Sequence, residues 1–429
     1  MFKRKIFENI LREVKTREII LIIGSRQVGK STILEEIYNN HIDWKSIFIN
    51  ADFDDSIINL VSSKDLLWML KLKWYKENSE ENFYVFIDEF QKIKNIWTII
   101  KWLYDTHKNI KFFLSGSSSI LINKVFGDSM LGRKKTFFLD KLNFREFLEF
   151  KQNKNLLEIY DNIDEIINIW IFEKDFLMAF EEYTTFWWYP NVVLENTKDD
   201  KIKVLEEVYN SYLQKDIKDF FSLEHYNDIK RLFIYLTSIN TNFLKINSIS
   251  NELWITNYNL KKYLSIIEWT YIIENVKPFF TNNIKTITKT NELFFTDTWF
   301  YNYILKNFSD INLRLDRWNL IENIVFTEIN KNKSLLTELF FFRDTKGLEV
   351  DLILKKENLT IPIEIKSWDY NKKPPLNLVN FTKTNKLDFA IIINKSRFEL
   401  IEFNWKKCLY LPYFLSGKIE YFIEKYFKN

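Results

Sequence analysis

Cysteine and histidine are nearly missing from this sequence, which contains one cysteine, Cys408, and 3 histidines. A single cysteine excludes an intramolecular disulfide and a metal site built from a cysteine cluster, and such scarcity is typical of proteins in a reducing compartment. With so few histidines we also expect no histidine-based zinc site. Disulfide-stabilised and zinc-binding classes of protein are therefore not expected.

Long apolar runs are missing as well. No segment approaches the ~20 consecutive apolar residues that a membrane-spanning helix needs. The first 18 residues, MFKRKIFENILREVKTRE, carry too much charge for the apolar core of a secretory signal. We therefore expect a soluble cytoplasmic protein that has no membrane partner.

The length and charge of the chain set further limits. At 429 residues the chain is too long for one ordinary hydrophobic core, so two to four domains are expected. The net charge of +3 excludes a polycation, although a local basic face can still bind nucleic acid.

Short apolar runs alternate with helical patterns in the first third of the chain. We predict strands at 18–23, 46–50, 83–87 and 111–114, and a helix from about Lys30 to Asn39. Apolar runs of this length are typical of parallel strands that are buried on both faces. The pattern predicts an α/β fold with an N-terminal parallel sheet and helices packed against it.

The rest of the chain begins with helical patterns from about residue 143 to 238. Two short helices, at 248–253 and 257–268, flank a turn and are followed by strands, which is typical of a winged helix-turn-helix. A helix from about Asn319 and strands at 336–343, 349–354 and 361–365 predict a C-terminal α/β domain.

The segment GSRQVGKS, Gly24–Ser31, matches the pattern G-x-x-x-x-G-K-[ST] of a phosphate-binding P-loop. It follows a predicted strand and opens a predicted helix, as such a loop requires. Glycines allow the loop N–H groups to turn toward phosphate, Lys30 brings a cation to the β- and γ-phosphates, and the Ser31 hydroxyl can bind Mg²⁺. The expected nucleotide-binding residues are Gly24, Ser25, Arg26, Gln27, Val28, Gly29, Lys30, Ser31 and Thr32.

Two carboxylates follow the strand predicted at 83–87, in the segment FIDEFQ. Ligands bind at the carboxyl ends of parallel strands, where Asp88 and Glu89 are expected to lie. Asp88 is expected to hold Mg²⁺ together with Ser31, directly or through water. Glu89 is placed to orient or deprotonate the water that attacks ATP.

Two more residues are candidates for catalysis. Ser117 follows the third strand in the segment SGSSS and can hydrogen-bond the γ-phosphate or the water, although a serine here can instead cap a helix. Arg133 can stabilise transition-state charge, in its own subunit or in that of a homo-oligomer neighbour, or it can be a solvated arginine.

Together these segments resemble a family of AAA-type ATPases from bacteria and archaea that carry a C-terminal domain of unknown function. GSRQVGKS is similar to the family pattern G-x-R-Q-V-G-K-T, FIDEFQ to F-I-D-E-x-Q and SGSSS to T-G-S-S-S. MLGR is similar to L-A-G-R, LNFREF to L-S-F-R-E-F, and the resemblance continues almost to the C-terminus. It implies binding of ATP and Mg²⁺ and hydrolysis of ATP, and it implies no particular substrate.

The segment EVDLILKKENLTIPIEIKS resembles restriction-endonuclease-like folds, in which an aspartate precedes an E-x-K strand. Asp351 and Glu364 would bind a divalent ion, Lys366 would stabilise charge, and Glu322 could add a third carboxylate. Strand alternation places Glu364 and Lys366 on one face. The motif is short and a fold does not imply an activity, so an inactive domain remains an alternative.

These patterns predict four domains. They are a P-loop ATPase domain at 1–150, a helical region at 151–235, a winged helix-turn-helix at 236–305 and a restriction-endonuclease-like domain at 306–429. Asn257, Asn259, Lys261 and Lys262 lie near the second helix of the winged region and could contact DNA. We expect an ATPase that acts on DNA; the alternative is a nucleotide-switched module that binds protein partners and has an inactive nuclease-like domain.

Glycine is scarce, at 7 residues, whereas tryptophan is common, at 14. The family resemblance implies glycine at Trp187, Trp188, Trp254, Trp299 and Trp318. A tight turn between helices also favours glycine over tryptophan. One hypothesis is that UGA codons are read as glycine in the source organism and appear here as tryptophan. The alternative is a protein that uses these rings in its core, as we expect for Trp97.

Overall fold

The computed structural model describes residues 4–42, 45–53, 62–117, 132–163, 166–186, 189–213, 225–280, 286, 289–370, 372–403 and 406–427. The chain divides into two compact units, Met1–Lys141 and Leu142–Asn429. The four predicted domains are a finer division than these two units. Over the described residues, no helix is both long and apolar enough to cross a membrane.

A five-stranded parallel sheet with the order β2-β3-β4-β1-β5 forms the centre of the first unit. Its strands are β1 (Ile19–Ile23), β2 (Ser46–Asn50), β3 (Phe83–Asp88), β4 (Ile110–Gly116) and β5 (Lys134–Phe138). The first four strands confirm the prediction to within two residues. The sequence did not indicate β5, because KKTFF is only partly apolar and no residue of this strand is fully buried.

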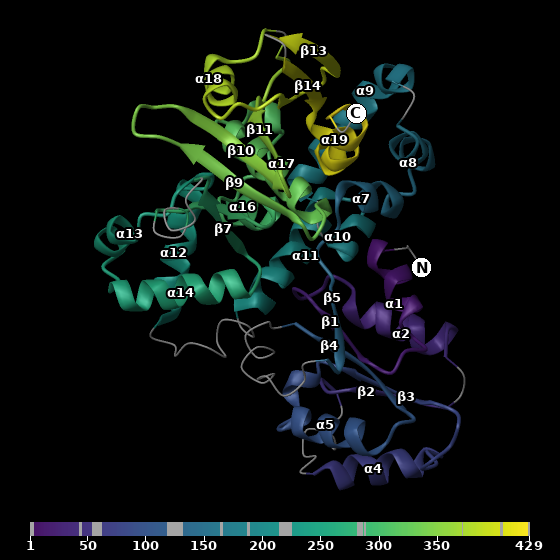
Figure 1. Ribbon diagram of the computed structural model, residues 1–429. Helices are drawn as coiled ribbons and strands as arrows, with labels where there is room; N and C mark the ends of the chain where they lie inside the picture. Colours follow the sequence, from purple (N-terminus) through teal and green to yellow (C-terminus); the bar gives the residue numbers. More distant parts are fainter. Residues whose placement is uncertain are drawn as a thin grey trace. The chain divides into compact units, whose positions relative to one another are not determined.

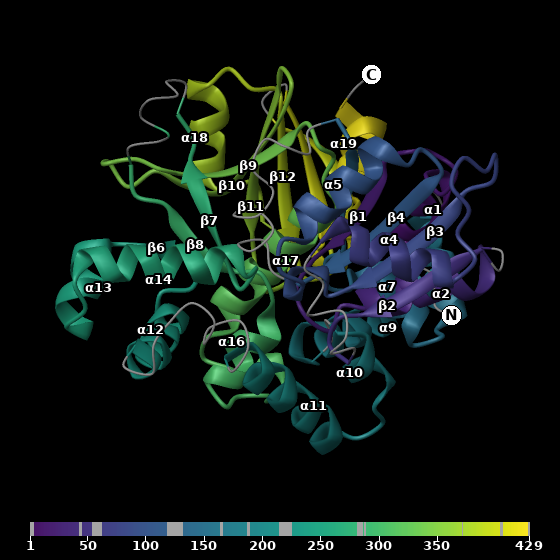
Figure 2. The same cartoon turned by 90° about the horizontal axis from the view of Figure 1, so that it is seen from below.

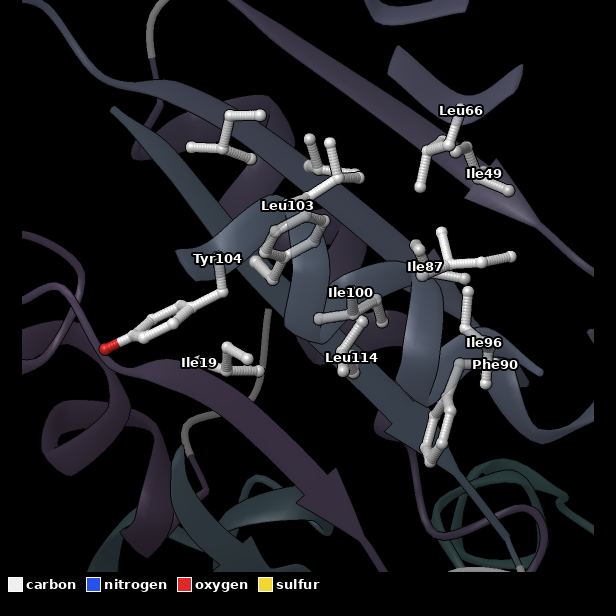
Figure 3. Packing of buried hydrophobic residues seen from close by; sticks show 14 of the residues in the cluster. Ile19, Ile49, Leu66, Ile87, Phe90, Ile96, Ile100, Leu103, Tyr104 and Leu114 are labelled. Atoms are coloured by element: carbon white, nitrogen blue, oxygen red, sulfur yellow. The ribbon is translucent and has the colours of Figure 1, made fainter. Parts of the chain in front are cut away.

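Helices cover both faces of this sheet (Figure 1). They are α1 (Lys5–Arg12), α2 (Lys30–Asn40), α4 (Ser63–Leu72) and α5 (Ile96–Thr106). Leu66, Ile100 and Leu103 of α4 and α5 join Ile87 and Leu114 of the sheet in one buried cluster (Figure 3). The strands can be almost wholly apolar because both faces are buried.

The opposite face is covered through aromatic contacts. Tyr38 of α2 meets Phe86 edge-on at 5.5 Å, and Phe86 stacks on Phe113 at 4.6 Å between ring centroids. These layers confirm the predicted α/β fold, and they leave the carboxyl ends of the strands for polar side chains.

The second unit contains a nine-stranded mixed sheet with the order β13-β14-β12-β11-β10-β9-β7-β8-β6. The strands are β6 (Asn242–Phe243), β7 (Ile273–Pro278), β8 (Glu292–Phe295), β9 (Thr337–Arg343), β10 (Glu349–Lys356), β11 (Leu359–Ile365), β12 (Phe389–Asn394), β13 (Glu399–Phe403) and β14 (Lys406–Pro412). The three strands predicted between 336 and 365 are confirmed as β9, β10 and β11. A short parallel pairing of β7 with β9 joins the strands that follow the helix-turn-helix to the C-terminal strands.

Helices fill the rest of the second unit. They include α7 (Phe144–Phe150), α8 (Lys154–Asp161), α9 (Ile166–Phe186), α10 (Pro190–Leu194), α11 (Lys198–Ser211), α12 (Tyr226–Ser238), α16 (Thr298–Ile304), α17 (Arg317–Asn332), α18 (Leu376–Thr384) and α19 (Ile419–Phe427). Leu378 and Phe381 of α18 pack against Val350 and Ile353 of β10, and α17 contacts β11 (Figure 2).

The predicted helix-turn-helix is confirmed as α13 (Ile246–Leu253) and α14 (Asn257–Trp269). The antiparallel strands β7 and β8 follow it, and α14 contacts β7 (Figure 2). Thr256 caps α14 by accepting a hydrogen bond from the backbone N–H of Asn259. This capping threonine fixes the start of the second helix at the predicted residue.

Tryptophan occupies the left-handed position that ends two of the helices. Trp74 follows α4 with φ 69°, and the N–H of Tyr75 donates to the carbonyl of Leu70 across it at 3.0 Å. Trp254 follows α13 with φ 56°. The two residues are 79% and 92% exposed, so burial of the side chain does not compensate for the backbone conformation. Glycine is favoured at this position, which supports the recoding hypothesis at Trp254 and adds Trp74 to it.

The other tryptophans give different results. Tyr271 and Lys386 take the same left-handed conformation after α14 and α18. A left-handed conformation at a tryptophan therefore does not by itself identify a recoded glycine. Trp299 is buried in α16 and Trp318 lies in α17, where helical backbone does not require glycine. Trp187 and Trp188 lie outside the described residues.

Trp74→Gly is expected to raise the free energy of unfolding of the first unit by about 1 kcal/mol, because glycine removes the left-handed strain. Trp68→Gly is the matched control, since Trp68 is exposed inside the same helix and glycine there should cost about 1 kcal/mol. Urea denaturation of both variants measures the difference. Destabilisation of both by the same amount would contradict the strain at Trp74.

Candidate nucleotide-binding site

The loop Gly24–Ser31 connects β1 to α2 at the carboxyl edge of the first sheet. Gly29 has φ 97°, a left-handed conformation that directs the chain into α2 and favours glycine. The ammonium group of Lys30 is buried and donates to the carbonyls of Gly24 at 3.1 Å and Ser25 at 2.7 Å. The loop therefore encircles a positive charge at the N-terminus of a helix.

This loop fits a phosphate group. Ser25 Oγ is buried and has no hydrogen-bond partner among the described residues, so the loop contains an unused donor. Backbone N–H groups at the start of α2 are also available there, and the helix dipole favours an anion. The hydroxyl of Ser31 and the carboxylate of Asp88 are oxygen ligands of the kind that Mg²⁺ takes.

Arg4 supports the loop, and sequence reasoning missed it. Its side chain is buried and donates to the carbonyl of Val28 at 2.7 Å and to the carbonyl of Asp140. It thus fixes the P-loop backbone to the chain that follows β5. A lone arginine near the N-terminus carries no motif, and only the structure identifies its contact.

Asp88 is the last residue of β3 and is 2% exposed. Strand β4 lies between β3 and β1, so the residues that end β4 lie between Asp88 and the P-loop. Ser115 Oγ donates to Asp88 Oδ1, and the N–H of Glu89 donates to the same oxygen at 3.2 Å. Ser115 was not among the predicted site residues, although its segment was.

Glu89 and Ser117 are brought together at this edge of the sheet. Glu89 has φ 50°, and it begins the short 3-10 helix η1 (Phe90–Lys92). Ser117 Oγ donates to Glu89 Oε2 at 3.3 Å, and Gln91 Nε2 donates to the same oxygen. The structure thus places Ser117 beside the carboxylate; its contact with a γ-phosphate stays a prediction.

Arg133 lies at the opposite end of the sheet from the P-loop. Its carbonyl accepts from the N–H of Ile19, the first residue of β1, whereas the P-loop follows the last residue of that strand. Its guanidinium forms an ion pair with Asp105 at 2.9 Å. The structure therefore does not bring Arg133 to the P-loop of its own chain, because parallel strands place these two ends a full strand length apart. A role toward a neighbouring subunit stays a prediction.

The predicted C-terminal residues gather around one cavity of ≈ 290 Å³, whose lining includes Glu322, Asp351 and Glu364. Lys366 Nζ pairs with Glu364 Oε1 at 2.7 Å, and Asp351 Oδ2 accepts from the N–H of Ile365 at 2.6 Å. Within the described ranges, however, no group of three or more histidine, cysteine or acidic side chains is arranged to hold a metal ion. A third carboxylate ligand from Glu322 is therefore not supported, whereas binding of a divalent ion by Asp351 and Glu364, with Lys366 stabilising charge, stays a prediction. In the structure the backbone holds one of these carboxylates and the lysine holds the other.

Burial dominates the electrostatics of this cavity. It raises the pKa of Glu322 to about 8, and the nearby carboxylate of Glu292 adds to the shift. Burial likewise raises the pKa of Glu292 to about 8, against the opposing effect of Arg343. The pKa of Asp351 lies well above its usual value because of burial and the charge of Glu364. These acids are therefore favoured in the protonated form when the unit is folded.

The second unit is expected to lose stability as the pH rises from about 5 to 8. A carboxyl with a raised folded-state pKa stabilises the fold below its unfolded pKa and loses that contribution as the pH passes through the folded value, here about 8 for Glu292. Glu292→Gln should lose part of this pH dependence, because the amide does not ionise. Hydrogen exchange of peptides covering β8, with EDTA present and intrinsic rates subtracted, measures the effect. Equal pH dependence in the parent and the variant would contradict it.

Comparison with protein families matches residues 16–148 to an AAA domain. Residues 178–310 and 319–414 match two domains of unknown function, DUF8612 and DUF4143. The match at 178–310 runs across the predicted boundaries at 235–236 and 305–306, so the four-domain division stays a prediction. The AAA match covers the P-loop, Asp88, Glu89 and Ser117.

Related proteins span much of the chain. The uncharacterized protein MJ1544 of Methanocaldococcus jannaschii is 28% identical over 349 residues, which cover 80% of this chain and 73% of that protein. The uncharacterized protein MJ1637 of the same organism is 23% identical over 302 residues, 65% of this chain and 60% of that protein.

Solved structures include the ORC2 protein of Aeropyrum pernix in its ADP form, with 14% identity and a TM-score of 0.30, covering 63% of this chain and 84% of that one. TM-scores this low carry no argument about function. The family match and the site geometry carry the assignment instead: the first unit is an AAA-type P-loop ATPase domain.

Proposed function

We propose that this protein binds ATP and Mg²⁺ in its first unit, hydrolyses the ATP, and uses the energy to act on DNA. The observation that carries the proposal is the meeting of three strand ends at one edge of the sheet. The P-loop follows β1, Asp88 and Glu89 follow β3, and Ser117 follows β4 between them. A cradle for phosphates thus lies beside a carboxylate that can accept a proton.

Each residue would have one task in hydrolysis. Lys30 and the loop N–H groups would bind the β- and γ-phosphates, and Ser31 and Asp88 would hold Mg²⁺, which neutralises phosphate charge when bound. Glu89 would accept the proton of the water whose oxygen bonds to the γ-phosphorus. The bond from that phosphorus to the bridging oxygen breaks, and ADP leaves with its electron pair.

The helix-turn-helix supports a DNA-bound form of the protein. Leu260, Tyr263 and Leu264 bury one face of α14, whereas Lys261 and Lys262 are exposed on the other. Exposed lysines on the second helix of such a motif suit contacts with phosphates.

A second candidate function rests on a different observation. Tyr258, at the start of α14 in the same motif, is 80% exposed. Exposed aromatic side chains are more typical of protein interfaces than of phosphate contacts. The alternative is therefore a nucleotide-switched module that binds a protein partner through this surface.

DNA is expected to stimulate the ATPase rate, and the stimulation should fall steeply as salt rises because phosphate contacts release counterions. Lys261→Ala/Lys262→Ala should lower the slope of log affinity against log salt by about 2. The control is Lys372→Ala/Lys373→Ala, an exposed pair before α18. An ATPase rate that ignores DNA at every salt concentration, with no retention on DNA, would favour the protein-binding module.

A further inference from the structure

Gln91 is held in the candidate active site by contacts to Glu89, which lies two residues before it after β3, and to Ser117, which follows β4. Its Nε2 donates to Glu89 Oε2 and lies 3.5 Å from Ser117 Oγ. Ser117 Oγ in turn donates to Glu89 Oε2. The three side chains form a closed triangle in which a single carboxylate oxygen receives both donors.

The other end of the Gln91 amide is buried without a partner. Its Oε1 has no hydrogen bond among the described residues, although a buried amide oxygen is normally satisfied. Exchange of the two amide ends would place Oε1 against the Glu89 carboxylate, which repels it, so the observed orientation is the favourable one. In this orientation Gln91 Nε2 donates to Glu89, and Gln91 Oε1 is left without a hydrogen bond.

Gly116 makes room for this amide. A Cβ at residue 116 would lie 2.5 Å from Gln91 Oε1 and 2.8 Å from the ring of Phe90. Glycine at the end of β4 and glutamine in η1 therefore depend on each other, although they are 25 residues apart in the sequence. The lack of a side chain at Gly116 leaves the space in which the Gln91 amide donates to Glu89.

We propose that Gln91 is a positioning residue for Glu89, and this inference rests on the proposed ATPase function. Its N–H, together with the Ser117 hydroxyl, occupies Glu89 Oε2 and holds the carboxylate in one rotamer. The second oxygen, Oε1, then remains to accept the proton of the attacking water. Gln91 itself transfers no proton and touches no phosphate.

The test is a double-mutant cycle on the full chain with Gln91→Leu and Glu89→Gln. Leucine has nearly the volume of glutamine but no donor, so single-turnover hydrolysis should slow by about 10- to 100-fold. The dissociation constant of a fluorescent ATP analogue should stay within about 3-fold, because Gln91 does not hold the phosphates. In the Glu89→Gln background, Gln91→Leu should add less than about 2-fold, since the base it positions is already lost. Gln152→Leu, at an exposed glutamine after α7, is the control for the substitution itself.

The outcomes separate this inference from the proposed function. Absence of ATP binding and hydrolysis in the parent chain would overturn the proposed function. Parent-rate hydrolysis by Glu89→Gln would overturn the role of Glu89 as the base, and with it the role of Gln91, while ATP hydrolysis itself would stand. If Glu89→Gln hydrolyses ATP slowly but Gln91→Leu hydrolyses it at the parent rate, only the role of Gln91 is overturned. Additive losses of rate in the double variant would also overturn the role of Gln91, because Gln91 would then act independently of Glu89. Weaker nucleotide binding that matches the loss of rate would overturn it as well, because Gln91 would then act through the fold of the site.

Discussion

Glu89→Gln is expected to keep ATP binding and to slow hydrolysis by about 10²–10⁴-fold, the range for a lost general base. The amide has the shape of the carboxylate and its oxygen can still accept from Ser117, whose Oγ lies 3.3 Å from the present carboxylate. It cannot take a proton from water, so only the chemical step should suffer. Phosphate release under single-turnover conditions measures the rate, and equilibrium binding of a fluorescent ATP analogue measures the affinity.

Glu80→Gln is the matched control for this substitution. Glu80 is an exposed glutamate in the loop before β3, and its loss should leave the rate unchanged. Hydrolysis by Glu89→Gln at the parent rate would show that another group takes the proton.

Lys30→Ala is expected to weaken ATP binding by about 30-fold or more, since losing one member of a buried charge contact costs at least ~2 kcal/mol. Lys30 is 4% exposed and is bound by loop carbonyls, so its charge is shielded from water and acts at close range. Titration with the fluorescent ATP analogue at fixed Mg²⁺ measures the loss.

Two controls separate binding from folding in this experiment. Lys64→Ala removes an exposed lysine from α4 and should bind ATP as the parent does. Thermal unfolding of Lys30→Ala without nucleotide tests whether the loop keeps its structure when the ammonium group is gone. A folded Lys30→Ala that binds ATP with the parent's affinity would contradict the P-loop assignment.

The sequence alone was sufficient wherever one short segment defines both the structure and the chemistry. Gly24–Ser31 follows an apolar strand and begins a helix, and the structure has the loop between β1 and α2 as predicted. Asp88 and Glu89 end an apolar run in the same way, and Thr256 marks the start of α14 by capping it. These features are local, so residues close in sequence are enough to specify them.

Only the tertiary structure decided which of these segments meet. Strand order in a parallel sheet does not follow the sequence, and β4 lies between β1 and β3 here. That order brings Ser115 to Asp88 and Ser117 to Glu89 and Gln91, whereas Arg133 precedes β5 and so lies at the other end of the sheet. No local pattern encodes such neighbours, because the contacts join strand ends that are distant along the chain.

The same reason separates prediction from structure in the second unit. The strand pair placed Asp351 near Glu364 and Lys366, as the sequence indicated. Whether those groups can bind a cation depends on what else reaches them: the N–H of Ile365 holds Asp351, and Lys366 holds Glu364. Burial then favours the protonated acids, and burial is a property of the packed unit that no single segment determines.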